Sequence, residues 1–276
     1  MEGQPVPASW LERYLAFLGV EREVPGRDAL ARLVRAQIEG VVFENVTAIL
    51  RRARTGEGPV PPVDPEALLG AWTEQRGGGV CFDLVPTFRR LLAGLGYRVQ
   101  PLLAQISFPG SHHAALVEVG DGRYLVDIGG GSPLWRPIPI GETIEIGHAG
   151  LGFRLRPEGS SEYVQERRTD GDWVPTCRYD LRPADPALRE AAYQRHQLAG
   201  ETWVVGNLTL VRSTADAVHR LREDELVSYT ADGKRVERLV DGADYRRVAA
   251  EVFGLPGLPI DEARAVLDEI RRARAG

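Results

Sequence analysis

The hydrophobic pattern changes near Tyr97, and this change constrains the fold more than any other feature of the chain. Before it, apolar residues recur at three- and four-residue spacings, which place them on one face of a helix. After it, short β-rich segments alternate with turn residues to about residue 182. Because helical and strand segments occupy separate stretches, the sequence predicts an α+β fold.

Helices are expected through most of the first hundred residues. Ser9 is the predicted N-cap of the first helix, which continues to Leu18 and ends at Gly19. Further helices are predicted over residues 26–39, 65–75 and 81–95, and loops rich in Gly and Pro separate them.

The rest of the chain is predicted to begin with antiparallel strands and to end with a mixture of strands and helices. The expected strands at residues 98–106, 112–119 and 124–128 suit a small barrel or a curled sheet. A strand at 203–212, a hairpin around the turn at 231–233 and helices at 244–253 and 260–274 follow. We therefore expect three parts, at residues 1–97, 98–200 and 201–276.

The composition is that of an ordinary globular protein. The chain has 276 residues, of which 43% are hydrophobic and 26% are charged, and its formal net charge is -5. This balance gives no reason to expect nucleic acid or a membrane surface as a partner. No stretch reaches the roughly 18 apolar residues of a membrane helix, and the N-terminus does not resemble a signal peptide. The expected location is therefore the cytoplasm.

The chain contains two cysteines, Cys81 and Cys177. Two are too few for a disulfide framework, and no Cys/His cluster suits a zinc site, so we expect no metal. A single bridge between the two stays open on the sequence alone. Cys177 is otherwise expected to be an inert small hydrophobe.

Cys81 has the surroundings of a nucleophile. It follows three glycines at residues 77–79 and begins the predicted helix 81–95. Glycines allow a sharp turn and the close approach of a ligand. A helix N-terminus offers free N–H groups and partial positive charge, which favour a thiolate and can stabilise an oxyanion. A cysteine in such a position is also often purely structural, so this feature alone does not assign a reaction.

A cysteine nucleophile needs a base, and two adjacent histidines are candidates. His112 and His113 begin one predicted strand, and Asp127 lies on the next strand, beyond a Gly-Asp-Gly turn at residues 120–122. Antiparallel pairing would bring the histidines and Asp127 to the same end of this hairpin. A carboxylate there would orient the imidazole and stabilise its positive form.

Several ordered segments resemble the arylamine N-acetyltransferase family. Residues 78–84 (Gly-Gly-Val-Cys-Phe-Asp-Leu) are similar to its Arg-Gly-Gly-x-Cys-x-Glu/Gln signature. Residues 42–46 (Val-Phe-Glu-Asn-Val) resemble its Pro-Phe-Glu-Asn-Leu box, and residues 124–131 resemble its Tyr-Leu-Val-Asp-Val-Gly-Phe-Gly segment. The opening helix fits as well, so the similarity covers about residues 8–132. The family's separation between its histidine and aspartate selects His112.

This resemblance implies an N-terminal helical bundle, a central antiparallel β-barrel and a C-terminal α/β lid around a papain-like Cys-His-Asp centre. It implies a ping-pong reaction in which Cys81 takes an acyl group, usually from acetyl-coenzyme A. The group then passes to an arylamine, arylhydrazine or hydroxyarylamine. His112 would move protons and Asp127 would orient it. The residues expected to bind substrate are Phe43, Val80, Phe82, Phe108, Gly130 and Gly131.

Other residues in and near these segments are expected to have structural roles. Phe43, Glu44 and Asn45 are expected to be structural rather than catalytic, with a buried Glu or Asn tying the helical bundle to the active-site loop. His113 is expected to point away from His112, because side chains alternate along a strand. The other three histidines are expected at the surface.

The sequence departs from the family pattern at several positions. Gly77 stands where the family has Arg, and Arg76 lies one residue early, which a one-residue bulge would correct. Asp83 replaces a Glu or Gln, and Val85 replaces an Asn. Gly130 replaces a Phe that lines the family's acceptor pocket. Loss of that ring would enlarge the pocket, so we expect a bulkier acceptor or acyl group.

Three other functions compete with acetyl transfer. An amide synthase of the same fold would take a polyketide acyl chain from an acyl carrier protein and close a macrolactam. The Arg-, Ala- and Gly-rich composition, typical of high-GC genomes, favours this alternative weakly. A hydrolase or transglutaminase-like enzyme would use the same three residues, and a non-catalytic relative would only bind ligands.

Overall fold

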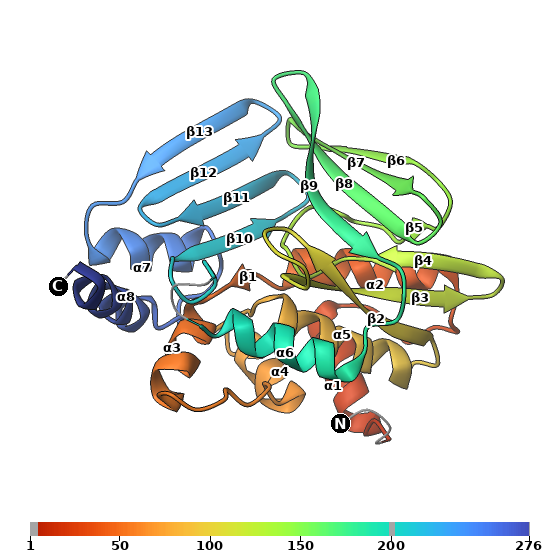
Figure 1. The fold of residues 1–276 in the computed structure, drawn as a ribbon, viewed down its shortest axis with the longest axis horizontal. Coiled ribbons are helices and arrows are strands. Elements are labelled where there is room, and N and C mark those ends of the chain that lie inside the picture. The colour runs from red at the N-terminus through yellow and green to blue at the C-terminus, as the bar shows by residue number, and fades with distance from the viewer. Residues whose placement is uncertain (1–4, 199–201, 276) are drawn as a thin grey trace.

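Helices form most of the first part of the chain (Figure 1). The computed structural model describes residues 5–198 and 202–275. Its first elements are α1 (Ala8–Leu18), α2 (Arg27–Gly40), β1 (Phe43–Glu44), α3 (Val46–Thr55), α4 (Pro65–Thr73) and α5 (Cys81–Gly94). The predicted helices are confirmed within a few residues, whereas α3 and the short β1 are absent from the sequence-based prediction.

The first helix begins differently from the prediction but ends as expected. Its N-cap is Pro7, whose carbonyl accepts from the backbone N–H groups of Trp10 and Leu11, and no side chain caps it. The predicted N-cap Ser9 is therefore wrong, because Ser9 lies inside the first turn. Gly19 adopts a left-handed conformation with φ 65° and ends the helix, as glycine can without steric cost.

The central part is one antiparallel sheet that curls into a nearly closed barrel. Its strands lie in the spatial order β5-β4-β3-β2-β9-β8-β7-β6. They are β2 (Arg98–Gln105), β3 (His112–Val119), β4 (Gly122–Val126), β5 (Ile138–Pro139), β6 (Ile144–His148), β7 (Leu151–Glu158), β8 (Glu162–Thr169) and β9 (Asp172–Asp180). Buried Leu102, Leu116, Leu125, Tyr163 and Tyr179 belong to its core. The predicted barrel or curled sheet is confirmed.

The last part combines a second antiparallel sheet with helices. It contains α6 (Pro186–His196), β10 (Thr209–Ser213), β11 (Ala217–Arg222), β12 (Glu225–Thr230), β13 (Gly233–Arg238), α7 (Gly242–Glu251) and α8 (Ile260–Ala275). The hairpin β12–β13 and the two terminal helices match the prediction, while α6 and β11 were not predicted. The predicted boundary between residues 200 and 201 lies outside the described residues. In the described chain, no helix is both long and apolar enough to cross a membrane.

The second sheet incorporates a strand from the helical part. Its order is β1-β10-β11-β12-β13, with Phe43 paired to Val211 at the junction. The strand predicted over residues 203–212 is therefore too long, because only its end, from Thr209, pairs with other strands. The stretch before it forms turns instead.

Asn45 explains why this strand starts at Thr209. The fully buried Asn45 amide donates to the carbonyl oxygens of Val204, at 2.7 Å, and Asn207. Its Oδ1 accepts from the Thr209 N–H at 2.8 Å. The side chain thus satisfies three buried backbone groups and ties the lid sheet to the helical bundle.

We expect Asn45→Ala to lower the free energy of unfolding by about 3 kcal/mol, because buried backbone groups lose their partners. Urea denaturation measures this loss. The matched control is Asn207→Ala, which removes one partly buried hydrogen bond to Glu223 and should cost about 1 kcal/mol. Equal stability of the Asn45→Ala protein and the unsubstituted protein would contradict this role.

Candidate active site

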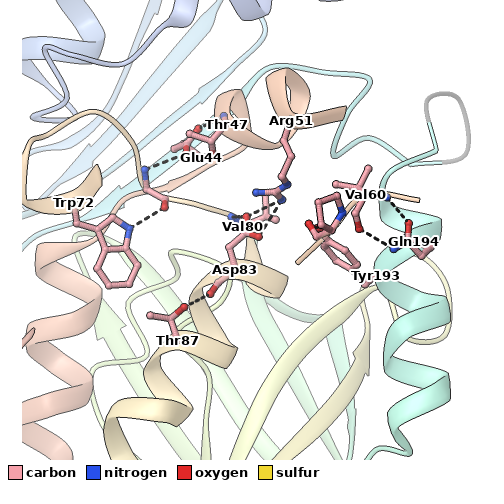
Figure 2. Close-up of polar contacts among 12 residues, drawn as sticks. Glu44, Thr47, Arg51, Val60, Trp72, Val80, Asp83, Thr87, Tyr193 and Gln194 are labelled. Carbon is pink, nitrogen blue, oxygen red and sulfur yellow. Dashed lines mark hydrogen bonds and ion pairs between the residues drawn. The ribbon is translucent and has the colours of Figure 1, made fainter. Parts of the chain in front are cut away.

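The loop before Cys81 is held in place by a buried carboxylate (Figure 2). Glu44 Oε1 accepts from the Gly78 N–H at 3.0 Å and from Thr47 Oγ1 at 2.6 Å. Trp72 Nε1 donates to the Gly78 carbonyl at 2.8 Å. Burial raises the pKa of Glu44. The prediction that this segment ties the helical bundle to the active-site loop is confirmed.

Glycine is required at position 78. A Cβ placed there would lie 1.8 Å from the Val42 carbonyl oxygen, a distance that no side chain can occupy. The loop therefore passes directly against Val42 and the start of β1, where Phe43 forms a parallel bridge with Gly79. This close approach positions the N-terminus of α5, and with it Cys81.

A buried ion pair fixes the first turn of α5 (Figure 2). Arg51 Nη2 lies 3.0 Å from Asp83 Oδ1, and Asp83 Oδ2 accepts from the Val80 N–H at 3.3 Å. Asp83 is 2% exposed, so the pair is largely shielded from solvent. Sequence reasoning missed Arg51, because helix α3, on which it lies, was not predicted.

His112 and Asp127 form the polar centre of the site. His112 Nε2 lies 2.8 Å from Asp127 Oδ2, and both side chains are buried. The Tyr179 hydroxyl lies 2.6 Å from the same oxygen, and the Gly129 N–H donates to Oδ1 at 2.8 Å. Strands β3 and β4 pair antiparallel, so the predicted meeting of His112 and Asp127 at one end of the hairpin is confirmed.

Cys81 and His112 converge on Gly129. A Cβ built on Gly129 would lie 2.8 Å from Cys81 Cβ and 3.1 Å from His112 Cε1. The absence of a side chain at this position therefore lets the thiol and the imidazole approach one another. The structure thus brings together the three residues that the sequence predicts as catalytic.

The electrostatics of the pair favour a charged imidazole. Burial lowers the pKa of His112, but the charge of Asp127 and hydrogen bonds with Asp127 and Cys81 outweigh it and raise the pKa well above its usual value. Burial raises the pKa of Asp127, but the His112 charge and its hydrogen-bond donors lower it overall. An imidazolium beside Cys81 would stabilise a thiolate.

A cavity of about 420 Å³ opens at Cys81 between the barrel and the lid sheet. Of the predicted substrate-binding residues, Phe43, Val80 and Gly130 line it. The other three, Phe82, Phe108 and Gly131, lie outside its lining, and contact between any of the six and a substrate stays a prediction. A Cβ on Gly130 would meet nothing closer than His112 Cε1 at 3.7 Å, so a side chain there has open space.

The remaining histidines divide into three kinds. His113 packs against the Phe82 ring at 5.3 Å and does not line the cavity, as predicted. His148 and His219 are partly exposed. His196 was predicted at the surface, and this is wrong: it is 2% exposed, lines the cavity and packs at tilted angles against Phe82 and Phe108. Burial lowers its pKa to about 4, so it is neutral at pH 7.

Both cysteines are free, so the bridge left open by the sequence does not form. Cys177 also lines the cavity, which the sequence did not suggest. Burial raises the pKa of its thiol to about 12, so it stays protonated at neutral pH. It is therefore a weak nucleophile, as the prediction of an inert residue requires.

The residues that depart from the family pattern differ in their surroundings. Arg76 points outward and pairs with Glu74, so no bulge brings it to the position of Gly77. Gly77 lies closely against α3 and the buried carboxylate instead, since a Cβ there would lie 2.9 Å from Thr47 Cγ2 and 3.6 Å from Glu44 Oε1. Val85 lies in the hydrophobic core.

Within the described chain, no group of three or more His, Cys, Asp or Glu side chains could hold a metal ion.

Known proteins resemble this chain over most of its length. A family model described as N-acetyltransferase matches residues 28–260. The arylamine N-acetyltransferase of Mycolicibacterium smegmatis is 26% identical over 258 residues, which span 88% of this chain and 90% of that protein. The proansamycin X synthase of Amycolatopsis mediterranei is 22% identical over 255 residues, spanning 88% and 96%.

A solved structure shows the same fold. The arylamine N-acetyltransferase of Mycobacterium marinum, in complex with CoA, superimposes with a TM-score of 0.78 at 22% identity, covering 94% of this chain and 97% of that one. The chain belongs to the arylamine N-acetyltransferase family. The resemblance found in the sequence is therefore confirmed.

We expect Gly129→Ala to slow the alkylation of Cys81 by iodoacetamide at pH 7 on the order of tenfold, because the new methyl group would separate thiol and imidazole. Peptide mass mapping of the alkylated protein over time measures the rate at Cys81. Gly130→Ala is the matched control and should react as the unsubstituted protein does. Equal rates in both variants would refute the placement of Gly129 between the two side chains.

Proposed function

We propose that this protein transfers an acetyl group from acetyl-coenzyme A to an arylamine, arylhydrazine or hydroxyarylamine through an acetyl-cysteine at Cys81. The observation that carries the proposal is the position of His112, hydrogen-bonded to buried Asp127 and converging with Cys81 beside Gly129. This is the arrangement that activates a thiol for attack on an acyl group.

In the first half-reaction, the Cys81 thiolate attacks the thioester carbonyl of the donor. The oxyanion that forms would accept hydrogen bonds from free N–H groups at the start of α5. Collapse of this intermediate breaks the carbon–sulfur bond of the donor and leaves an acetyl-cysteine. The departing coenzyme A thiolate takes its proton from the His112 imidazolium.

In the second half-reaction, the amine attacks the acetyl-cysteine. His112, now neutral, takes the proton that the amine loses, and Cys81 departs as a thiolate. Asp127 orients the ring and stabilises the imidazolium formed at this step. The acceptors proposed suit this site because their weakly basic nitrogen is neutral at pH 7 and attacks without first losing a proton.

The similarity to known proteins supports the donor and the acceptor. Relatives named arylamine N-acetyltransferase share most of their length with this chain, and one of them is solved with CoA. We also propose that the three parts at residues 1–97, 98–200 and 201–276 are domains and that the protein works in the cytoplasm.

Intact-protein mass spectrometry after mixing with acetyl-coenzyme A tests the proposal. We expect a gain of one acetyl group that an arylamine then removes, with the acetylated arylamine as the product. Cys81→Ala should show no gain, and Cys177→Ala, the matched control, should gain the group normally. An adduct that water discharges as fast as an arylamine would indicate a hydrolase. The absence of an adduct would exclude acetyl-coenzyme A as the donor.

An amide synthase is the second candidate, and Gly130 favours it. The space beside Gly130 extends the cavity where a typical family member carries a phenyl ring, and one relative is named a proansamycin X synthase. Such an enzyme would accept its acyl chain from an acyl carrier protein. Faster acylation of Cys81 by a carrier-bound thioester than by the same acyl group on coenzyme A would favour this candidate.

We expect Gly130→Phe to shift the preference between a bulky and a small arylamine by on the order of tenfold towards the small one. The phenyl group would fill the space next to His112 and leave less room for a large acceptor. The ratio of kcat/KM for aniline and a naphthylamine measures the shift. An unchanged ratio would show that this space does not set acceptor size.

A further inference from the structure

Two arginines face the cavity from opposite sides. Arg167 on β8 belongs to the barrel and Arg220 on β11 belongs to the lid sheet, and both line the cavity that contains Cys81. On the lid side, Phe43, Val211 and Arg220 are successive cross-strand partners, so their side chains share one face of the sheet. Arg220 is therefore directed into the same space as Phe43.

The register relates both arginines to residues that contact the candidate centre or the loop before it. Arg220 lies two strands from Phe43, about 10 Å, and Phe43 is bridged to Gly79 in the loop before Cys81. Arg167 lies two residues along β8 from Gln165, roughly 7 Å. Gln165 Oε1 is 2.7 Å from the Tyr179 hydroxyl, which contacts Asp127.

Neither arginine has an anionic partner in the described residues, in contrast to their neighbours on the barrel. Arg154 and Arg156 pair with Glu166, and Arg178 pairs with Glu158. No hydrogen bond or ion pair joins Arg167 or Arg220 to any part of the chain that the structure describes. Both are partly buried, so each loses some hydration without gaining a carboxylate.

The two charges also act on one another. Burial lowers the pKa of Arg220, and the charges of Arg222 and Arg167 lower it further. An anion between the arginines would relieve this repulsion. Guanidinium groups match the geometry of carboxylate and phosphate oxygens and bind them through paired hydrogen bonds.

We propose that Arg167 and Arg220 form an oxyanion-binding site that holds a negatively charged group of a substrate while its reactive end lies at Cys81. This site rests on the proposed function in that the ligand is a substrate of the cavity. The oxyanion has two possible sources: a carboxylate on the ring of the arylamine acceptor, or a phosphate of the donor beyond its pantetheine arm.

Direct binding measured by calorimetry tests the site without relying on turnover. Two ligand pairs separate the sources: 4-aminobenzoate with its uncharged amide, and coenzyme A with pantetheine. In Arg167→Met and Arg220→Met proteins we expect the anionic member of one pair to bind roughly 10- to 100-fold more weakly, with its uncharged counterpart unchanged. The affected pair identifies the source.

Arg168→Met and Arg222→Met are the matched controls. Both residues are exposed neighbours on the same strands and lie outside the cavity lining, so binding of all four ligands should be unchanged. If a cavity variant does not fold, binding to the unsubstituted protein is measured in the presence of inorganic phosphate instead. Phosphate should then weaken binding of the anionic ligand and leave binding of its uncharged counterpart unchanged. No selective loss of either anionic ligand, or equal loss in the controls, would overturn the proposal.

Failure of this site and failure of the proposed function are distinguishable. Transfer of acetyl to the uncharged amide with no anion selectivity would leave the acetyltransferase proposal standing and remove the oxyanion site. Anion-selective binding without any acetyl-cysteine would retain the site and remove the proposed reaction.

Discussion

The geometry of the candidate site depends on the buried carboxylate of Asp127. It accepts hydrogen bonds from a histidine on β3, from the backbone of its own loop at Gly129 and from the Tyr179 hydroxyl on β9. A buried carboxylate is tolerated only when such donors and a positive charge compensate its lost hydration. The same bonds that stabilise Asp127 therefore fix His112 against the barrel and direct it towards Cys81.

The nucleophile reaches this centre through a second set of buried polar contacts. Glu44 binds the glycine loop before α5, and its neighbour Asn45 binds the backbone that precedes the lid strand β10. Two adjacent residues thus connect the helical bundle to the active-site loop and to the lid. This arrangement makes the position of Cys81 a property of the whole fold, because the barrel supplies its base and the lid closes the cavity.

The sequence was most informative where chemistry and local structure coincide. The glycine run and the helix start identified Cys81, and the turn at residues 120–122 brought His112 towards Asp127, because a short hairpin fixes its own register. It was least informative for α3 and α6, and so Arg51 and His196 were missed. Each of these residues becomes significant only through partners distant in the chain, which no local pattern reveals.

The sequence by itself determined the change from helical to strand segments near Tyr97, the three residues of the candidate centre and the family. Periodicity, turn residues and short motifs are local properties, and the chain carries them whatever its tertiary structure. Only the tertiary structure decided that Arg76 points outward, that Cys177 enters the cavity and that Arg167 and Arg220 face it together. The physical reason is that burial, cavities and unpaired charges arise from packing between distant segments.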